Sequence, residues 1–424
     1  MSYGPSSFLY APRYLRFQQS LLVLIDLQLL RRLFKSSLIV NQGLPHRPLL
    51  QLIEDLPTFF KKVGYFSDRF FESALLAVKL FFQINTFPVV SKHLPLLHSI
   101  ASFFGANVQS VFLHVIDTFS ADEFLDCSPT ISGLEMVFKH PHDLEFLNKS
   151  SPSFFPRLEL LHINLRRIYK AALGAKALSD SLTVNDTVMS LDLYNNSIGA
   201  EGATALADML RVNRTITSIN LRYNNIGAEG AIALAEALKV NDTINILNLE
   251  NNSIGSEGAT VLSDALKVNT TLTSINLRYN SIGVDGATAL AEMLKVNDTI
   301  TSIDLAVNSI GNEGVGTVAE SLLINNTLSS VNLHNNSIGT GGALKLAEAL
   351  KVNFAITNVN LGFNSVGDEG VVALAEAFNV NSVVTNVNLY NNSIGTKGAM
   401  ALADGLKSND TITTVNLFHN SIFR

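Results

Sequence analysis

A phrase of nine residues returns at fixed intervals through the second half of the chain. "LDLYNNSIG" begins at residue 191, "INLRYNNIG" at 219 and "LNLENNSIG" at 247, and further copies begin at 275, 303, 331, 359, 387 and 415. The interval is 28 residues each time, with no insertion or deletion. An undisturbed period of this length indicates an array of one structural unit.

Each repeat combines a strand pattern with a helix pattern. In "TSINLRYNSIG", apolar and polar residues alternate as in a short strand with one buried face, so Ile275 and Leu277 should point inward. The next residues, "VDGATALAEMLKVN", change to helical spacing. Four apolar residues lie there at i, i+3, i+4 and i+7: Ala287, Leu290, Ala291 and Leu294. We also expect Asp285 in the first helical turn and Lys295 in the last, where each charge suits the helix dipole.

One such unit cannot bury both its strand face and its helix stripe, so the units must stack and share a core. Parallel strands stack about 4.8 Å apart, whereas helices pack roughly 8–10 Å apart. The helix side of the stack must therefore be longer than the strand side. These spacings predict an α/β solenoid, a horseshoe with its sheet on the concave side.

An asparagine ends the strand pattern in all nine copies of the phrase. Its amide carries two donor hydrogens and an acceptor oxygen, so it can satisfy backbone groups of the turn in its own unit and in the next one. We interpret these residues as a structural ladder. They are Asn196, Asn224, Asn252, Asn280, Asn308, Asn336, Asn364, Asn392 and Asn420.

A second asparagine follows each predicted helix. Asparagine tolerates the left-handed backbone conformation that often ends a helix, and we expect that conformation here. These residues also create Asn-x-Thr glycosylation motifs, such as the one at Asn213, but the repeat copies them and they are weak evidence of secretion. The set is Asn185, Asn213, Asn241, Asn269, Asn297, Asn325, Asn353, Asn381 and Asn409.

The pattern LxxLxLxxN followed by IGxxGxxxLxxxL resembles the leucine-rich repeat, specifically its 28-residue ribonuclease-inhibitor-like class. That class also occurs in Ran GTPase-activating proteins and in the sensor arms of NOD-like receptors. The resemblance covers residues 157–424, about nine to ten repeats, and implies a right-handed horseshoe of strands and helices. A degenerate copy precedes them in "LLHINLRRIYKAALGAKALSDSL", where Ile168 replaces the asparagine, and "FFPRLELLHI" can also be aligned two residues out of phase.

The two positions directly before the ladder asparagine differ from copy to copy. Both should lie on or beside the concave face, and tyrosine and arginine, which dominate interface hot spots, are frequent there. We therefore predict that the concave face binds a partner. The candidate partner-binding residues are Tyr194, Arg222, Tyr223, Glu250, Arg278, Tyr279, His334, Phe363, Tyr390 and Phe418.

A second interpretation of these positions stays open. Exposed positions drift, and Arg222, Glu250 and Arg278 can simply neutralise one another on adjacent strands. A third polar ladder lies four residues before the ladder asparagine, and cross-strand hydrogen bonds explain it. It consists of Asp192, Asn220, Asn248, Asn276, Asp304, Asn332, Asn360, Asn388 and Asn416.

Residues 1–156 have a different composition. All 11 prolines lie at or before Pro156, and twenty of the 25 phenylalanines lie at or before Phe155. "LLVLIDLQLLRRLF" has the length and apolar face of a helix, whereas "GLEMVF" and "RLELL" suggest irregular leucine-rich units. We expect this region to cover the first edge of the solenoid, either with helices or with degenerate repeats.

Several classes of function are disfavoured. Cys127 is the only cysteine, which excludes a disulfide within the chain and favours a reducing, cytoplasmic compartment. The net charge of −6 does not fit a nucleic-acid binder, and no apolar run is long enough to span a membrane. "HPHD", at 140–143, is more often a surface loop than a metal site, and no GxxxxGK[ST] loop is present. We expect no cofactor, no metal and no catalysis.

The leading hypothesis is a non-enzymatic interaction scaffold with a protein partner on its concave face. The resemblance to Ran-directed activators implies an alternative, a GTPase-activating protein with a small GTPase as partner. A third hypothesis is the sensor arm of a NOD-like receptor without its nucleotide-binding domain. Because "HNSIFR" leaves the last unit without a helix, we also expect self-association through an uncapped C-terminal edge.

Overall fold

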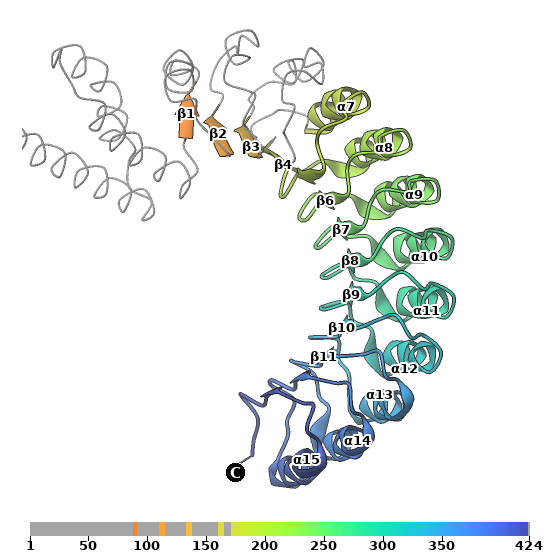
Figure 1. The fold of residues 1–424 in the computed structure, drawn as a ribbon, viewed down its shortest axis with the longest axis vertical. Helices are drawn as coiled ribbons and strands as arrows, with labels where there is room; N and C mark the ends of the chain where they lie inside the picture. Colours follow the sequence, from red (N-terminus) through yellow and green to blue (C-terminus); the bar gives the residue numbers. More distant parts are fainter. Residues whose placement is uncertain (1–87, 91–109, 115–132, 138–159, 165–170, 423–424) are drawn as a thin grey trace, which may run out of the picture. The chain divides into compact units, whose positions relative to one another are not determined.

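The computed structural model describes residues 88–90, 110–114, 133–137, 160–164 and 171–422, all within one compact unit that runs from Thr86 to Arg424 (Figure 1). The described strands form one parallel sheet of thirteen strands, in which their order matches their order in the chain. The sheet stays open, because β1 and β13 are its two edges. The fold is the α/β solenoid that the spacings predict, of the leucine-rich-repeat type that the resemblance implies.

The strands are short and the helices are three to four turns long. The strands are β1 (Pro88–Val90), β2 (Ser110–His114), β3 (Gly133–Val137), β4 (Leu160–Asn164), β5 (Ser190–Asp192), β6 (Ser218–Asn220), β7 (Ile246–Asn248), β8 (Ser274–Asn276), β9 (Ser302–Asp304), β10 (Ser330–Asn332), β11 (Asn358–Asn360), β12 (Asn386–Asn388) and β13 (Thr414–Asn416). The helices are α7 (Ala171–Leu182), α8 (Gly199–Leu210), α9 (Gly227–Leu238), α10 (Gly255–Leu266), α11 (Gly283–Leu294), α12 (Gly311–Leu322), α13 (Thr340–Val352), α14 (Gly367–Val380) and α15 (Thr396–Ser408).

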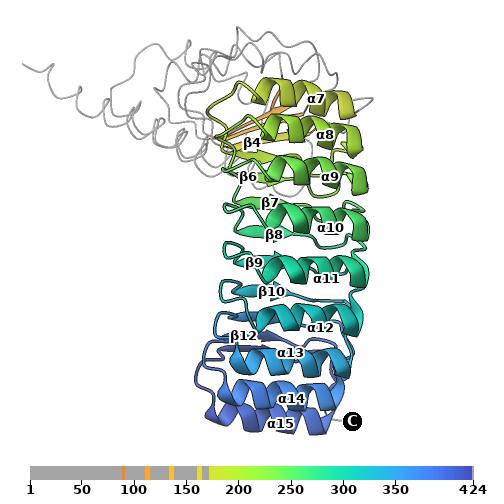
Figure 2. The ribbon, with the colours of Figure 1, turned by 90° about the vertical axis from the view of Figure 1, so that its right-hand side faces the viewer.

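Strands and helices lie on opposite sides of the stack. Figure 1 shows the strands on the concave side of the curved stack and the helices on the convex side, and Figure 2 shows α7 to α15 side by side along it. In β5 to β12, each residue pairs with the residue 28 positions later in the next strand, as Ser274 pairs with Ser302. Equivalent residues of successive repeats therefore stand in rows across the sheet.

The strand before the regular array follows a different register. Leu161 of β4 pairs with Leu191 of β5, which is 30 residues later rather than 28. The alignment with Ile168 in the asparagine position is therefore wrong, and the alternative alignment, two residues out of phase, is the one that the sheet adopts. β1, β2 and β3 also join the sheet although they lie before residue 156. The domain boundary at that residue stays a prediction.

The core lies between the sheet and the helices. Ile275 and Leu277 of the β8 region are buried, as is the predicted helix stripe of Ala287, Leu290, Ala291 and Leu294. Asp285 lies in the first turn of α11 as expected. The placement of Lys295 in the last turn was wrong: it is the residue that follows Leu294, and its Nζ lies 2.6 Å from Glu292 Oε1.

The last described repeat is less buried than the others. Val387 and Leu389 are buried at the β12 position, whereas Val415 and Leu417, their equivalents at β13, are partly exposed. Solvent therefore reaches apolar residues at this edge of the sheet. Self-association through the edge stays a prediction.

Candidate functional site

The ladder asparagines are engaged inside the scaffold. Asn280 Nδ2 donates to the Leu249 carbonyl of the preceding repeat at 2.9 Å and to its own repeat's Leu277 carbonyl at 3.0 Å. Asn280 Oδ1 accepts the backbone N–H of Asn252 at 2.9 Å and that of Ile254 at 3.3 Å. The residue is fully buried. The side chain joins two turns and is closed to a partner.

The second set of asparagines has a different role from the predicted one. Asn353 has φ −87° and ψ 121°, which is extended backbone, so the left-handed helix end was wrong. Its Nδ2 donates to the carbonyls of Leu322 and Asn325 in the preceding repeat, both at 2.8 Å. Its Oδ1 accepts the backbone N–H of Ile356 at 2.9 Å. The extended backbone lets the amide reach the end of the neighbouring helix, where it satisfies a carbonyl that the helix itself leaves unpaired.

These contacts also occupy the glycosylation motifs. Asn213 is buried, and its Nδ2 donates to the carbonyls of Leu182 and Asn185. A glycan would replace one of these hydrogens in a site without room for it. The motifs at this position of the repeat are therefore part of the scaffold.

The left-handed conformation occurs instead on both sides of the ladder asparagine. Four aromatic residues have it at the position just before, Tyr223 at φ 59°, Tyr279 at 60°, Phe363 at 55° and His419 at 59°. Asparagine, which tolerates this conformation, holds the same position at Asn195, Asn251, Asn335 and Asn391. These four asparagines are the sign of the left-handed turn in the repeat pattern, although it was not predicted from the sequence. A large aromatic residue there strains the backbone, typically by about 1–3 kcal/mol.

The third polar ladder fixes the backbone of the variable positions. Asn276 Oδ1 accepts the backbone N–H of Arg278 at 2.9 Å, two residues along the same chain. The predicted cross-strand bonds occur in only some repeats, for example from Asn220 Nδ2 to Asp192 Oδ1 at 3.0 Å. The common contact is therefore local, and it holds each variable side chain at the same point of the concave face.

Six predicted residues form a first group at β5 to β8, which we call the arginine cluster: Tyr194, Arg222, Tyr223, Glu250, Arg278 and Tyr279. The guanidinium carbon of Arg222 lies 5.6 Å from the ring centre of Tyr194 and 4.9 Å from that of Tyr223. The two rings meet edge to face at 5.8 Å. Two hydrogen bonds lower the pKa of Tyr223 below its ordinary value, the one with Arg222 more strongly than the one with Asn251.

Glu250 is the centre of this cluster. Its Oε1 lies 3.1 Å from Arg222 Nη2 and 3.7 Å from Arg278 Nε, so it pairs with an arginine on each neighbouring strand. Its Oε2 accepts a hydrogen bond from Asn276 Nδ2 at 3.4 Å. The mutual neutralisation weighed from the sequence is thus present, although one carboxylate is shared by two cations.

The other four predicted residues form a second group at β10 to β13, which we call the aromatic cluster: His334, Phe363, Tyr390 and Phe418, with His419 beside them. Ring centres lie 5.0 Å apart for His334 and Phe363, 4.8 Å for Phe363 and Tyr390, and 6.0 Å for Tyr390 and Phe418. His419, which was not among the predicted site residues, lies 4.5 Å from Phe418 and 5.2 Å from Tyr390. Its repeat position, shared with Tyr223 and Phe363, could have identified it.

His334 is the titratable group of the aromatic cluster with a shifted pKa. Burial, and then the positive charge of Arg278, lower its pKa below the ordinary value, which Asp304 only partly offsets. The imidazole is therefore neutral at pH 7. His334 then adds no charge to the aromatic cluster.

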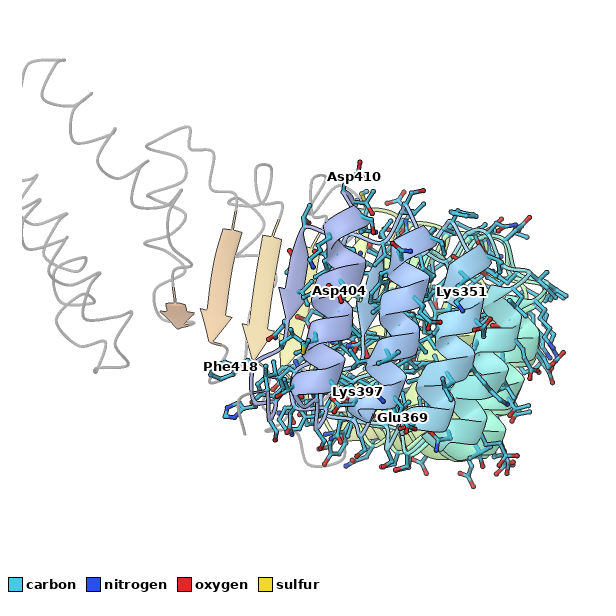
Figure 3. All side chains as sticks on the ribbon, turned by 90° about the horizontal axis from the view of Figure 1, so that it is seen from below. Lys351, Glu369, Lys397, Asp404, Asp410 and Phe418 are labelled. Carbon is cyan, nitrogen blue, oxygen red and sulfur yellow. The ribbon has the colours of Figure 1, made fainter. Side chains whose placement is uncertain are left out.

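The two clusters are separated along the sheet. At β9 the variable positions hold Ala306, which is buried, and Val307. Figure 3 shows Phe418 of the aromatic cluster on the opposite side of the solenoid from Lys351, Lys397 and Asp404 on the helices. The concave face thus offers a charged region and an apolar region, and the structure brings the ten predicted residues together as two groups rather than one.

Two further features are absent from the described residues. In that part of the chain, no three His, Cys, Asp or Glu side chains come together as metal ligands would. No helix there combines the length and apolar character needed to cross a membrane. The motif at 140–143 and Cys127 lie outside the described residues.

Known proteins resemble the chain in its repeats. The family described as "Leucine Rich repeat" matches eight consecutive segments: 184–207, 212–235, 240–263, 268–291, 296–319, 325–347, 352–375 and 380–403. No curated protein sequence matches the chain. Among solved structures, that of leiomodin-1 actin-binding site 2 is 22% identical with a TM-score of 0.30, over 42% of this chain and 87% of that one. The TLR13–ssRNA13 complex is 14% identical with a TM-score of 0.44, over 76% of this chain and 48% of that one.

Proposed function

Because the chain belongs to the leucine-rich repeat family, whose members generally serve as interaction domains, we propose that it is a non-enzymatic scaffold that binds a protein partner on its concave face. The surface would consist of the arginine cluster and the aromatic cluster. A large partner would span both, and a small one would use either.

The observation that carries the proposal is the exposed aromatic cluster. Phe363 is 42% exposed and Phe418 is 69% exposed, although each ring also touches Tyr390. Their backbone neighbours, the ladder asparagines, already satisfy the turn. A contiguous apolar surface that the fold does not need is a common mark of a binding site, and aromatic rings supply much of the energy of interfaces.

Two finer proposals accompany it. The period of 28 residues, with one α-helix per repeat, supports the ribonuclease-inhibitor-like class, to which the sensor arms of NOD-like receptors also belong. The single cysteine supports a reducing, cytoplasmic location. Fractionation of cells that express the tagged full chain tests the location, and recovery in the secreted fraction would contradict it.

Affinity capture on the immobilised full chain, followed by mass spectrometry, identifies the partner. Its dissociation constant is then measured for two double variants, Tyr223→Asn with Tyr279→Asn and Phe363→Asn with Tyr390→Asn. Asparagine suits Tyr223, Tyr279 and Phe363 because Asn195, Asn251 and Asn335 show that the left-handed turn accepts it, and Tyr390 lies outside these positions. We expect at least one pair to weaken binding by about tenfold or more, since a hot spot contributes about 2 kcal/mol.

The matched control lies on the helix side. Glu292 of α11 and Lys295, the residue that follows this helix, form an ion pair, and changing both to alanine removes two long side chains without altering net charge. This variant should bind as wild type does. If it loses the partner while both concave variants retain full affinity, the function resides on the convex surface and the proposal is wrong.

A further inference from the structure

The arginine cluster presents positive charge to the solvent. The side chain of Glu250 is 11% exposed, whereas those of Arg222 and Arg278 are 39% and 41% exposed. Both Glu250 oxygens are already engaged, one by the arginines and the other by Asn276. A molecule that approaches this part of the sheet therefore meets two guanidinium groups, while the carboxylate that balances them lies beneath.

The two arginines keep hydrogen-bonding capacity. Arg222 Nε is the only buried side-chain nitrogen or oxygen without a hydrogen-bond partner in the described part of the chain. Arg278 Nε is 3.7 Å from Glu250 Oε1, which is longer than a hydrogen bond. Arg222 Nε is closed to a partner because it is buried, whereas Glu250 leaves the half-exposed Arg278 without a hydrogen bond from its Nε, which a second carboxylate would supply.

Two further acids lie at the flanks of the cluster, and the scaffold engages both. Asp192 Oδ1 accepts the backbone N–H of Tyr194 and an amide hydrogen of Asn220. Asp304 accepts the backbone N–H of Ala306 with one oxygen and an amide hydrogen of Asn332 with the other, each at 2.9 Å. In the other repeats an asparagine holds this position. These two acids therefore serve as members of the third polar ladder, in place of asparagine. They do not pair with the arginines, which stay available to a partner.

A tyrosine with strained backbone follows each of the two arginines in the chain. Tyr223 and Tyr279 have φ values of 59° and 60°, where Asn195 and Asn251 of the alternate repeats avoid the strain. Tyr279 is 56% exposed, so the packing of its ring adds little stability to offset the backbone strain. Strained residues of this kind concentrate at functional sites. The rings of Tyr194 and Tyr223 beside the Arg222 guanidinium would shield a bound carboxylate from water and strengthen its ion pair.

We propose that the arginine cluster binds an acidic side chain, aspartate or glutamate, within a segment of the protein partner. The inference rests on the proposed function and names the chemistry of its partner at this end of the concave face. The carboxylate would bind to Arg278 and Arg222 between the rings of Tyr223 and Tyr279. Charge complementarity selects this occupant, because the exposed groups at the site are cationic and aromatic.

A display library of random short peptides, selected on the full chain, tests the proposal without a known partner. We expect the enriched peptides to contain aspartate or glutamate beside an apolar residue. A synthetic peptide of the most enriched sequence should then lose at least tenfold in affinity with Arg278→Gln, and its affinity should fall as salt rises. Arg214→Gln is the matched control, because Arg214 pairs with Asp242 away from the cluster, and it should change nothing.

Glu250→Gln tests whether the cluster attracts an anion or a cation. It removes the competing negative charge and keeps one amide oxygen that can still accept from the arginines, while an NH2 group takes the place of the oxygen beside Asn276. The acidic peptide should therefore bind several-fold more tightly. Loss of affinity with Glu250→Gln together with unchanged or tighter binding with Arg278→Gln would mean that the peptide binds through a cation, and the inference would be wrong. Unfolding midpoints of both variants distinguish lost recognition from lost folding.

The remaining outcomes separate this inference from the proposed function. Peptides without acids that are lost with Phe363→Asn and Tyr390→Asn would leave the concave face as the binding surface and overturn the acidic partner. Peptides that bind every concave variant equally would overturn both. A selection that enriches no peptide counts against the acidic partner as well.

Discussion

Tyr279 and Asn280 are neighbours in the chain, and they illustrate two kinds of position in this molecule. Asn280 is fully buried, bonds two repeats together and has an asparagine equivalent in every copy. Tyr279 is 56% exposed, has a strained backbone and has asparagine, valine, phenylalanine or histidine equivalents in most other copies. Two adjacent residues thus differ in role: Asn280 stabilises the fold, whereas Tyr279 does not contribute to it.

The difference shows how a solenoid can change its partner without losing its structure. The ladder groups take their hydrogen bonds from backbone atoms, which every repeat supplies regardless of its variable residues. The variable side chains, in contrast, interact mainly with one another across the sheet, as Arg222, Glu250 and Arg278 do. Recognition can therefore vary along rows that leave the ladders untouched. Four predictions test this separation.

The largest effect is expected inside the ladder. Asn308 Nδ2 donates to the carbonyls of Leu277 and Leu305, and its Oδ1 accepts the N–H of Asn280. Asn308→Ala leaves these buried groups unpaired and should lower the free energy of unfolding by about 3 kcal/mol, the upper end for such a loss. Denaturant unfolding followed by circular dichroism measures it.

Asn420 provides the matched control for that measurement. It makes the same contacts, to the carbonyls of Leu389 and Leu417, but it lies in the last described repeat and is only partly buried. Water can replace the lost bonds there, so Asn420→Ala should have less than half the effect. Equal effects would show that burial does not set the strength of the ladder.

The next effect concerns the asparagines that follow the helices. Asn353→Gly removes bonds to the carbonyls of Leu322 and Asn325 and places a flexible residue in extended backbone. We expect a loss of about 2 kcal/mol in the free energy of unfolding. If the position were left-handed, as the sequence suggested, glycine would be favourable there. Unchanged or higher stability would therefore contradict the extended geometry.

The sequence alone predicted the buried residues that recur with the repeat. It failed at positions where the backbone conformation differs from the one that the residue type usually adopts. Apolar periodicity located Ile275, Leu277 and the α11 stripe, because burial leaves a direct mark on residue type. The left-handed turn leaves a weaker mark, since asparagine holds it in four repeats but tyrosine and phenylalanine occupy it in others against their preference. The backbone conformation of Asn353 could not be predicted either. Asparagine suits both a left-handed helix end and an extended segment whose amide bridges to the neighbouring repeat. The register at β4 was ambiguous because leucines occur in both phases.

The third prediction is a gain of stability. Tyr279→Asn relieves strained backbone and removes a ring that is 56% exposed, so the free energy of unfolding should rise by about 1 kcal/mol. Tyr390→Asn is the control, because Tyr390 is outside the left-handed positions and contacts Phe363 and Phe418. That variant should lose stability or stay unchanged. A loss with Tyr279→Asn would mean that the ring supports the fold, which would break the separation of the two kinds of position.

The smallest expected effect is a pH dependence through His334, a variable residue that is partly buried. Burial and Arg278 lower its pKa in the folded chain, so the folded state binds the proton less readily than the unfolded state does. Stability from this residue is therefore fully present above the unfolded pKa of about 6.5, and it declines as the pH falls through that value toward the folded pKa. His334→Gln should remove this part of the pH dependence. The measurement is the difference between wild type and His334→Gln in unfolding free energy at pH 7.5 and at pH 5, in which the contributions of all other titrating groups cancel. If the difference in unfolding free energy between the two proteins is the same at both pH values, the imidazole titrates in the folded chain as it does in water. This variable residue would then resemble Tyr279, in that its surroundings in the fold do not affect it.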